Sequence, residues 1–127
     1  MGAKKFTDLV VWQKANDLSL KIYKLTESFP AEERFRLTDQ MRTAASTIPR
    51  NIAEGFGRLT PRDQARFYTI AKSSGDELKS DLIQTKGLGY ADVAACEELL
   101  DEVCAMLYVL RRRVLSGGPG DREGGRR

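Results

Sequence analysis

The sequence predicts an all-α protein, an antiparallel up-and-down four-helix bundle. Four segments repeat apolar residues with the 3.6-residue period of an amphipathic helix, and no segment alternates apolar and polar residues as a half-buried strand does. Short breaks containing glycine or proline separate these segments, and short connections between long helices favour antiparallel neighbours. With 127 residues, 41% of them hydrophobic, the chain is long enough to form one domain around a single core.

The first helix is expected at about residues 8–28. Its apolar residues recur three and four positions apart, which gives one continuous seam along the helix. The seam consists of Val11, Ala15, Leu18, Ile22, Leu25 and Phe29. Pro30 follows directly and ends the helix, because proline cannot donate the next backbone hydrogen bond.

The second helix is expected at about residues 38–56. Thr38 is a suitable N-cap residue, and Gly55 and Gly57 mark the end. The seam consists of Met41, Ala45, Ile48, Ile52 and Phe56. Pro49 lies inside this helix, where proline costs about 3 kcal/mol relative to alanine, so a packing gain has to offset it.

The third helix is expected at about residues 60–86. Thr60 is predicted as its N-cap, Pro61 occupies the first helical position, and Asp63 completes a variant of the capping box. The seam consists of Phe67, Ile70 or Ala71, Ser74, Leu78, Leu82 and Thr85. Gly87 or Gly89 supplies the left-handed residue that commonly ends a helix.

The fourth helix is expected at about residues 92–115, which completes a four-helix domain over residues 1–115. Its seam consists of Cys96, Leu99 or Leu100, Val103, Leu107, Leu110 and Val114. Arginines 111–113 in the last turns suit the negative end of the helix dipole. The following segment SGGPGDREGGRR, residues 116–127, is rich in glycine and arginine and is predicted to be a disordered tail.

Composition argues against several functional classes. No apolar run is long enough to span a membrane, and the N-terminus lacks the pattern of a secretory signal, so we expect a cytoplasmic protein with no membrane partner. The chain has no histidine and no clustered cysteines or carboxylates at ligand spacing, so we expect no metal and no cofactor. Cys96 and Cys104 lie about 12 Å apart along one helix and cannot form a disulfide there.

An enzyme is not expected. Without histidine, the usual Ser-His and Cys-His nucleophiles are excluded. Glu54, Asp76 and Glu77 remain as general acids or bases, but carboxylates need a closed pocket with shifted pKa values, for which the sequence gives no sign.

Basic residues suggest a surface for nucleic acid. The net charge is +3, which permits nucleic-acid binding without requiring it, since a solvated surface explains the same charge. The candidates, most of them placed by sequence around the turn between the second and third helices, are Arg42, Arg50, Arg58, Arg62, Arg66 and Lys72. Such side chains would contact phosphates and give salt-dependent affinity. Aromatic residues such as Trp12 and Tyr68 could stack on bases, but core packing explains their helical spacing better.

A polar stripe follows the second helix beside its apolar seam. Thr47, Asn51, Glu54 and Arg58 recur at intervals of 4, 3 and 4 residues, which places them on one face. Glu54 and Arg58 form an i,i+4 pair of the favourable orientation. The stripe is either a solvated face with one ion pair or a surface that contacts another subunit or a polar ligand, and periodicity alone does not decide between these.

The order of several motifs resembles a known family. The segments FTDLVVWQKA, SFPAEERFRLTDQMRTAASTIPRNIAEGFGR, FYTIAKSSGDEL and GLGY are similar to those of the four helix bundle protein family. That family includes proteins encoded in intervening sequences of bacterial 23S rRNA genes and the accessory protein of diversity-generating retroelements. The resemblance covers about residues 6–115, although KSDLIQTK after Leu78 departs from the family pattern.

The resemblance implies a homopentamer of four-helix subunits with a basic surface for RNA or DNA. In the retroelement members a reverse transcriptase is the partner. The motif residues carried over to this chain, as an oligomer interface or a nucleic-acid-facing surface, are Gln40, Arg42, Pro49, Asn51, Glu54, Gly55 and Arg58. Two functions therefore stay open: a non-catalytic oligomer that binds nucleic acid, and a structural or protein-interaction scaffold that does not.

Overall fold

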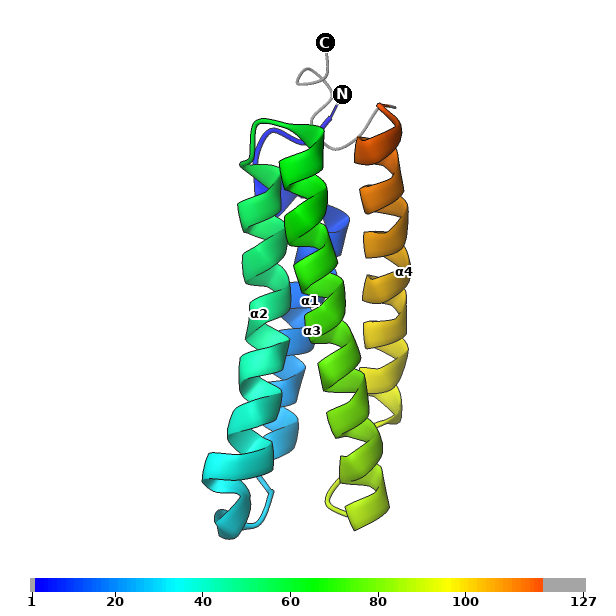
Figure 1. Cartoon of the computed structure of the whole chain (residues 1–127). Coiled ribbons are helices and arrows are strands. Elements are labelled where there is room, and N and C mark those ends of the chain that lie inside the picture. The colour runs from blue at the N-terminus through cyan, green and yellow to red at the C-terminus, as the bar shows by residue number, and fades with distance from the viewer. Residues whose placement is uncertain (1, 118–127) are drawn as a thin grey trace.

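The computed structural model describes residues 2–117 and contains four long α-helices and no strand in that range. They are α1 (Val10–Thr26), α2 (Asp39–Phe56), α3 (Pro61–Leu88) and α4 (Ala94–Ser116). Consecutive helices run in opposite directions (Figure 1), and α1 also packs against α4, so the four close into a bundle. The predicted all-α class is confirmed, and the predicted up-and-down order agrees with this arrangement.

Short helical turns lead into α1 and α2. The segment η1 (Phe6–Asp8) precedes α1, and the connection from α1 to α2 contains η2 (Ala31–Glu33) and η3 (Arg34–Thr38). This connection is fixed to the α3–α4 connection, because the Tyr90 hydroxyl donates to Glu33 Oε2 at 2.8 Å. The α2–α3 turn, the start of α1 and the end of α4 lie at the opposite end of the bundle (Figure 1).

The expected helix bounds differ from the observed ones by at most two residues at either end. Two helices start two residues later than expected, α1 at Val10 and α4 at Ala94. The expectation that Thr38 caps α2 is wrong, because Thr38 has helical backbone angles and its buried side chain caps nothing. The chain bends at Phe35 and Arg36, whose backbone angles are not helical, and it is already helical at Thr38. The predicted tail falls almost entirely on residues 118–127, outside the described residues.

The other helix ends agree with the expected chemistry. The Thr60 side chain accepts a hydrogen bond from the Asp63 backbone N–H at 3.1 Å, as an N-cap should. Gly89 ends α3 with φ +72°, a left-handed conformation that glycine adopts without strain.

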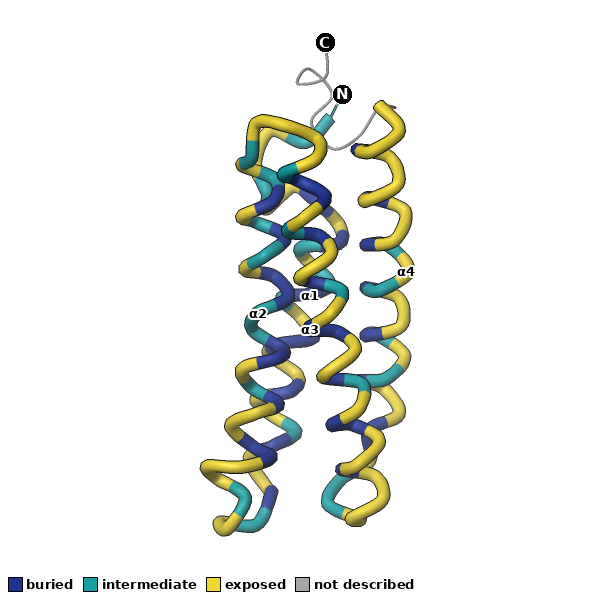
Figure 2. Tube along the Cα trace, in the orientation of Figure 1, coloured by how far each residue is buried: buried dark blue, intermediate teal, exposed yellow. Residues whose placement is uncertain are grey.

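The core follows the predicted seams with one main exception. Buried residues form a stripe on the inner side of each helix, and exposed residues cover the outside (Figure 2). On α3 the first core position is Tyr68, which is fully buried, and Phe67 is only half-buried. The prediction that Phe67 is a core residue is wrong, because α3 turns the next position, Tyr68, toward the core. No helix of the described residues is long and apolar enough to cross a membrane.

Candidate interaction surfaces on the helix bundle

Four charged side chains and one aromatic ring form a cluster at the α2–α3 turn, which we call the turn network. It consists of Glu54, Arg58, Asp63, Arg66 and Phe67. Arg58 pairs with Glu54 at 2.7 Å and with Asp63 at 3.6 Å, and Arg66 pairs with Asp63 at 3.3 Å. Both guanidinium carbons lie within 4.6 Å of the centre of the Phe67 ring. Each arginine is therefore held by carboxylates and by a cation–π contact.

The turn network carries no net charge. Two arginines face two carboxylates, so the positive charge predicted for this end of α2 is largely neutralised within the subunit. A phosphate group would have to compete with the carboxylates for the same donors of Arg58 and Arg66. Arg62, one turn before Arg66, is exposed and adds a positive charge at the edge of the network.

The remaining predicted basic residues do not join the turn network. Arg42 lies in the first turns of α2, and Arg58 follows the other end of that helix. Its guanidinium donates to the Thr26 hydroxyl at 2.8 Å and stacks over Tyr23, so it ties α2 to the end of α1. Lys72 pairs with Asp76, which raises its pKa. Arg50 is exposed on α2, about 12 Å from Arg58 along the axis.

Several motif residues are explained by packing inside the subunit. A Cβ atom at Gly55 would lie 2.7 Å from the buried ring of Tyr68 and 3.1 Å from Phe67 Cβ, so glycine is needed where α2 meets α3. The Asn51 amide donates back to the Thr47 carbonyl of its own helix at 2.9 Å. Pro49 is buried, and α2 continues through it to Phe56.

A polar hollow lies between the first turns of α2 and the later turns of α3. We call it the Asp81 hollow; its volume is about 410 Å³ and it is lined by Gln40, Ala44, Glu77, Ser80 and Asp81. Gln40 Nε2 donates to Asp81 Oδ1 at 2.9 Å. Burial raises the pKa of Asp81; the hydrogen bond from Gln40 opposes this effect, and the charge of Glu77 adds to it. The motif residue Gln40 therefore binds a carboxylate, Asp81, that was not predicted as a site residue.

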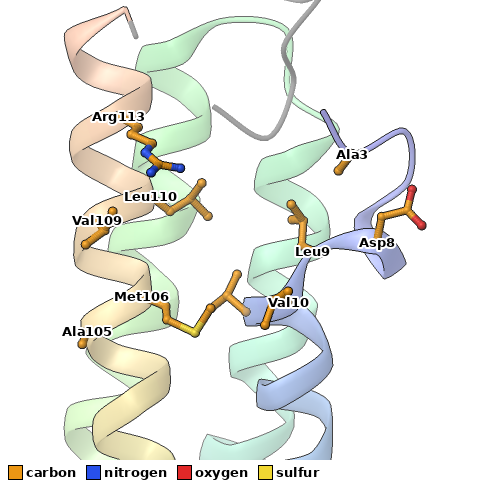
Figure 3. Close-up of a pocket in the computed structure, with 10 residues that line it drawn as sticks. Ala3, Asp8, Leu9, Val10, Ala105, Met106, Val109, Leu110 and Arg113 are labelled. Atoms are coloured by element: carbon orange, nitrogen blue, oxygen red, sulfur yellow. The ribbon is translucent and has the colours of Figure 1, made fainter. Parts of the chain in front are cut away.

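A second hollow, mainly apolar, lies between the start of α1 and the end of α4 (Figure 3). Its volume is about 490 Å³. Val10 and Val109 line it and are each about half exposed. Arg113 lies at one edge and Asp8 at another, where Asp8 accepts hydrogen bonds from the backbone N–H groups of Lys4 and Lys5, which lower its pKa.

The described part of the chain contains no cluster of metal ligands and no disulfide. No group of three or more cysteine, aspartate or glutamate side chains among residues 2–117 could hold a metal ion. Both cysteines are free thiols, and burial raises the pKa of each, so neither has the character of a reactive thiolate.

Sequence reasoning missed the Asp81 hollow although one signal was present. Asp81 lies between the seam residues Leu78 and Leu82 on α3, beside the predicted apolar face. A carboxylate next to a seam residue indicates a buried charge, which needs a partner. The spacing does not reveal that Gln40, on another helix, supplies only one hydrogen bond.

The fold places the protein in the class of all-α bundles in which four helices follow one another around a single core. Within that class, residues 7–111 match the family described as 23S rRNA-intervening sequence protein. The chain belongs to this family, which confirms the resemblance seen in the sequence. No curated protein sequence matches the chain.

Proposed function

We propose that the chain is a non-catalytic subunit of a cytoplasmic homo-oligomer, a homopentamer, which binds RNA or DNA through its outer surface. The observation that carries the assembly is the exposure of large apolar side chains. Leu59 is 87% exposed and Phe35 is 80% exposed, at opposite ends of α2. Val10 and Val109 are about half exposed and line the apolar hollow between α1 and α4, and an exposed patch of this kind is typical of surfaces that another protein covers.

Light scattering after size-exclusion chromatography tests the assembly. The proposal predicts a mass close to five times the 14.2 kDa of one chain, maintained on dilution through the micromolar range. A mass of one chain at every concentration would overturn the homo-oligomer. A mass equal to another multiple of one chain would support a homo-oligomer with a different number of subunits.

The nucleic-acid part of the proposal is supported by arginines that remain available. Arg50 and Arg62 are exposed and form no ion pair with another residue of the described chain. In an oligomer these two charges repeat on every subunit, which multiplies the contacts available to one RNA molecule. The partner in this reading is a structured RNA, alone or within a ribonucleoprotein that also contains another protein such as a reverse transcriptase.

A mobility-shift series with structured RNA at increasing salt tests this part. The double variant Arg50→Gln/Arg62→Gln should bind more weakly and with a smaller salt slope, because each lost phosphate contact lowers the slope by about one. Lys72→Gln is the matched control, since Lys72 already pairs with Asp76. No retardation of RNA by the wild type at low salt would contradict nucleic-acid binding.

A scaffold without nucleic-acid binding is the second candidate. The neutral charge of the turn network favours it, because Arg58 and Arg66 are occupied by carboxylates of their own subunit. This candidate predicts an oligomer of normal mass that retards no RNA at any salt concentration.

A further inference from the structure

In the Asp81 hollow, only one of the two oxygens of the Asp81 carboxylate has a hydrogen-bond partner among the described residues. Asp81 is 5% exposed. Its Oδ1 accepts from Gln40, whereas its Oδ2 is buried and has no hydrogen-bond partner among residues 2–117. A buried charged oxygen without a partner is costly, and native proteins seldom leave one in that state.

The shape and charge of the hollow indicate which ligand it would accept. Glu77 lies one helical turn before Asp81, so two carboxylates border the same space, together with the Ser80 hydroxyl. A guanidinium group offers five N–H donors in a plane and can contact more than one acceptor at once. Only two carboxylates border the hollow, and no group of three or more metal-ligating side chains occurs among residues 2–117.

A group of this chemistry is exposed at the same end of the bundle. The η3 segment places Arg34, Phe35 and Arg36 on the surface just before α2 begins, and we call these three residues the basic hook. The Arg34 guanidinium lies over the Phe35 ring at 5.2 Å. Arg36 has no ion-pair or hydrogen-bond partner for its side chain among the described residues.

The basic hook is held in place, and no ion pair joins it to Glu33, which precedes Arg34. The Glu33 carboxylate instead accepts the hydrogen bond of the Tyr90 hydroxyl at 2.8 Å. The ring of Tyr90 lies against Phe29 as well, with 5.3 Å between ring centres. The connection that carries the hook is therefore anchored to the bundle.

We propose that the Asp81 hollow binds the Arg36 guanidinium of a second copy of this chain, with Phe35 of that copy packed at its rim. The proposal rests on the homo-oligomer proposed above and assigns its contact. Charge complementarity supports the match, since one surface is acidic and recessed and the other is basic and protruding. Where the hook of each copy enters one neighbour and its hollow receives the hook of another, the contact is heterologous, the type from which closed rings are built.

Variants of the two surfaces test the contact. Asp81→Asn keeps the acceptor for Gln40 and removes the charge, while Arg36→Gln removes the guanidinium. We expect each to raise the dissociation constant of the oligomer at least tenfold, measured by light scattering over a concentration series. Asp76→Asn and Arg50→Gln are the matched controls on α3 and α2 and should assemble like the wild type. Thermal unfolding followed by circular dichroism establishes that every variant is folded.

Mixing the two variants identifies the geometry. Each Asp81→Asn subunit has an intact hook and each Arg36→Gln subunit an intact hollow, so a mixture restores one contact per pair. The expected species is a heterodimer that grows no further. Wild-type assembly by Asp81→Asn or by Arg36→Gln would overturn this contact and leave the proposed oligomer standing. A wild type that stays monomeric would overturn both.

Discussion

The two ends of the α2–α3 pair balance their charges differently. At the α2–α3 turn, the turn network matches two arginines with two carboxylates and places both guanidinium groups over Phe67. At the other end, Asp81 receives one hydrogen bond from Gln40, and its second oxygen has no partner within the described chain. At the first end each charged group pairs with a group of opposite charge in the same subunit, whereas at the other end the Asp81 carboxylate has no cationic partner among the described residues.

This difference separates residues that hold the subunit together from residues that join subunits. Gly55, Arg42 and the turn network make contacts inside one chain, so their substitution should act on stability before it acts on assembly. Substitution of Asp81 should weaken assembly without lowering the stability of the subunit, because its buried charge destabilises the isolated subunit. The following predictions test that contrast, beginning with the largest expected effect.

Gly55→Ala should lower the free energy of unfolding by about 1–3 kcal/mol, because overpacking a core forces side chains from their preferred positions. The new Cβ would lie 2.7 Å from the ring of Tyr68, which is fully buried and cannot turn away. Urea denaturation measures the change. The matched control is Gly57→Ala: its Cβ would meet no atom closer than 3.6 Å, so stability should stay nearly constant. Equal effects at the two glycines would contradict close packing at the turn.

Asp81→Asn should stabilise the isolated subunit at pH 7 by about 1 kcal/mol, since an amide is less costly to bury than a carboxylate. The measurement belongs in the Arg36→Gln background, where assembly does not contribute. Burial, with the charge of Glu77, raises the pKa of Asp81 above its ordinary value of 3.8. The folded subunit therefore binds this proton more tightly than the unfolded chain does, and stability falls as the pH rises through that window.

The pH dependence provides the control for this prediction. Well below pH 3.8 the carboxyl is protonated in both states, and the advantage of asparagine should disappear. Above the raised pKa the advantage should be complete. A difference in melting temperature between the two proteins that does not change with pH would show that the charge of Asp81 is not the cause.

The ion pairs of the turn network should have the smallest effect. A double-mutant cycle of Glu54→Gln and Arg58→Gln should give a coupling energy of about 0.3–0.5 kcal/mol, as expected for an i,i+4 pair near the surface. The coupling should weaken at high salt. Neither single variant should change the mass of the oligomer. A large loss of mass with either variant would move the subunit contact to the turn.

The sequence predicts the fold well because periodicity reports which face of each helix is buried. The seam of α2 from Met41 to Ile52 is fully buried as expected, and Thr60 caps α3. The start of α2 could not be predicted from Thr38, because Thr38 already has helical backbone angles and the chain bends just before it, at Phe35 and Arg36. Phe67 and Tyr68 are adjacent aromatic residues, and only packing decides which of them enters the core.

The candidate sites were harder to predict because charges pair across helices. The sequence suggests the same role for Arg42 and Arg58. In the structure Arg42 stacks on Tyr23 of α1, whereas Arg58 belongs to the turn network. Likewise, Gln40 and Asp81 are 41 residues apart, and only the fold brings them to 2.9 Å.

The most direct test of the account is an NMR titration of the Asp81 carboxyl carbon in two proteins, the assembled wild type and the dissociated Arg36→Gln variant. In the dissociated subunit the pKa should lie above 3.8. Because a guanidinium favours the charged carboxylate, the pKa in the assembled protein should be lower than in the subunit. The same pKa in both proteins would contradict the claim that Asp81 acquires its missing partner from a neighbouring copy.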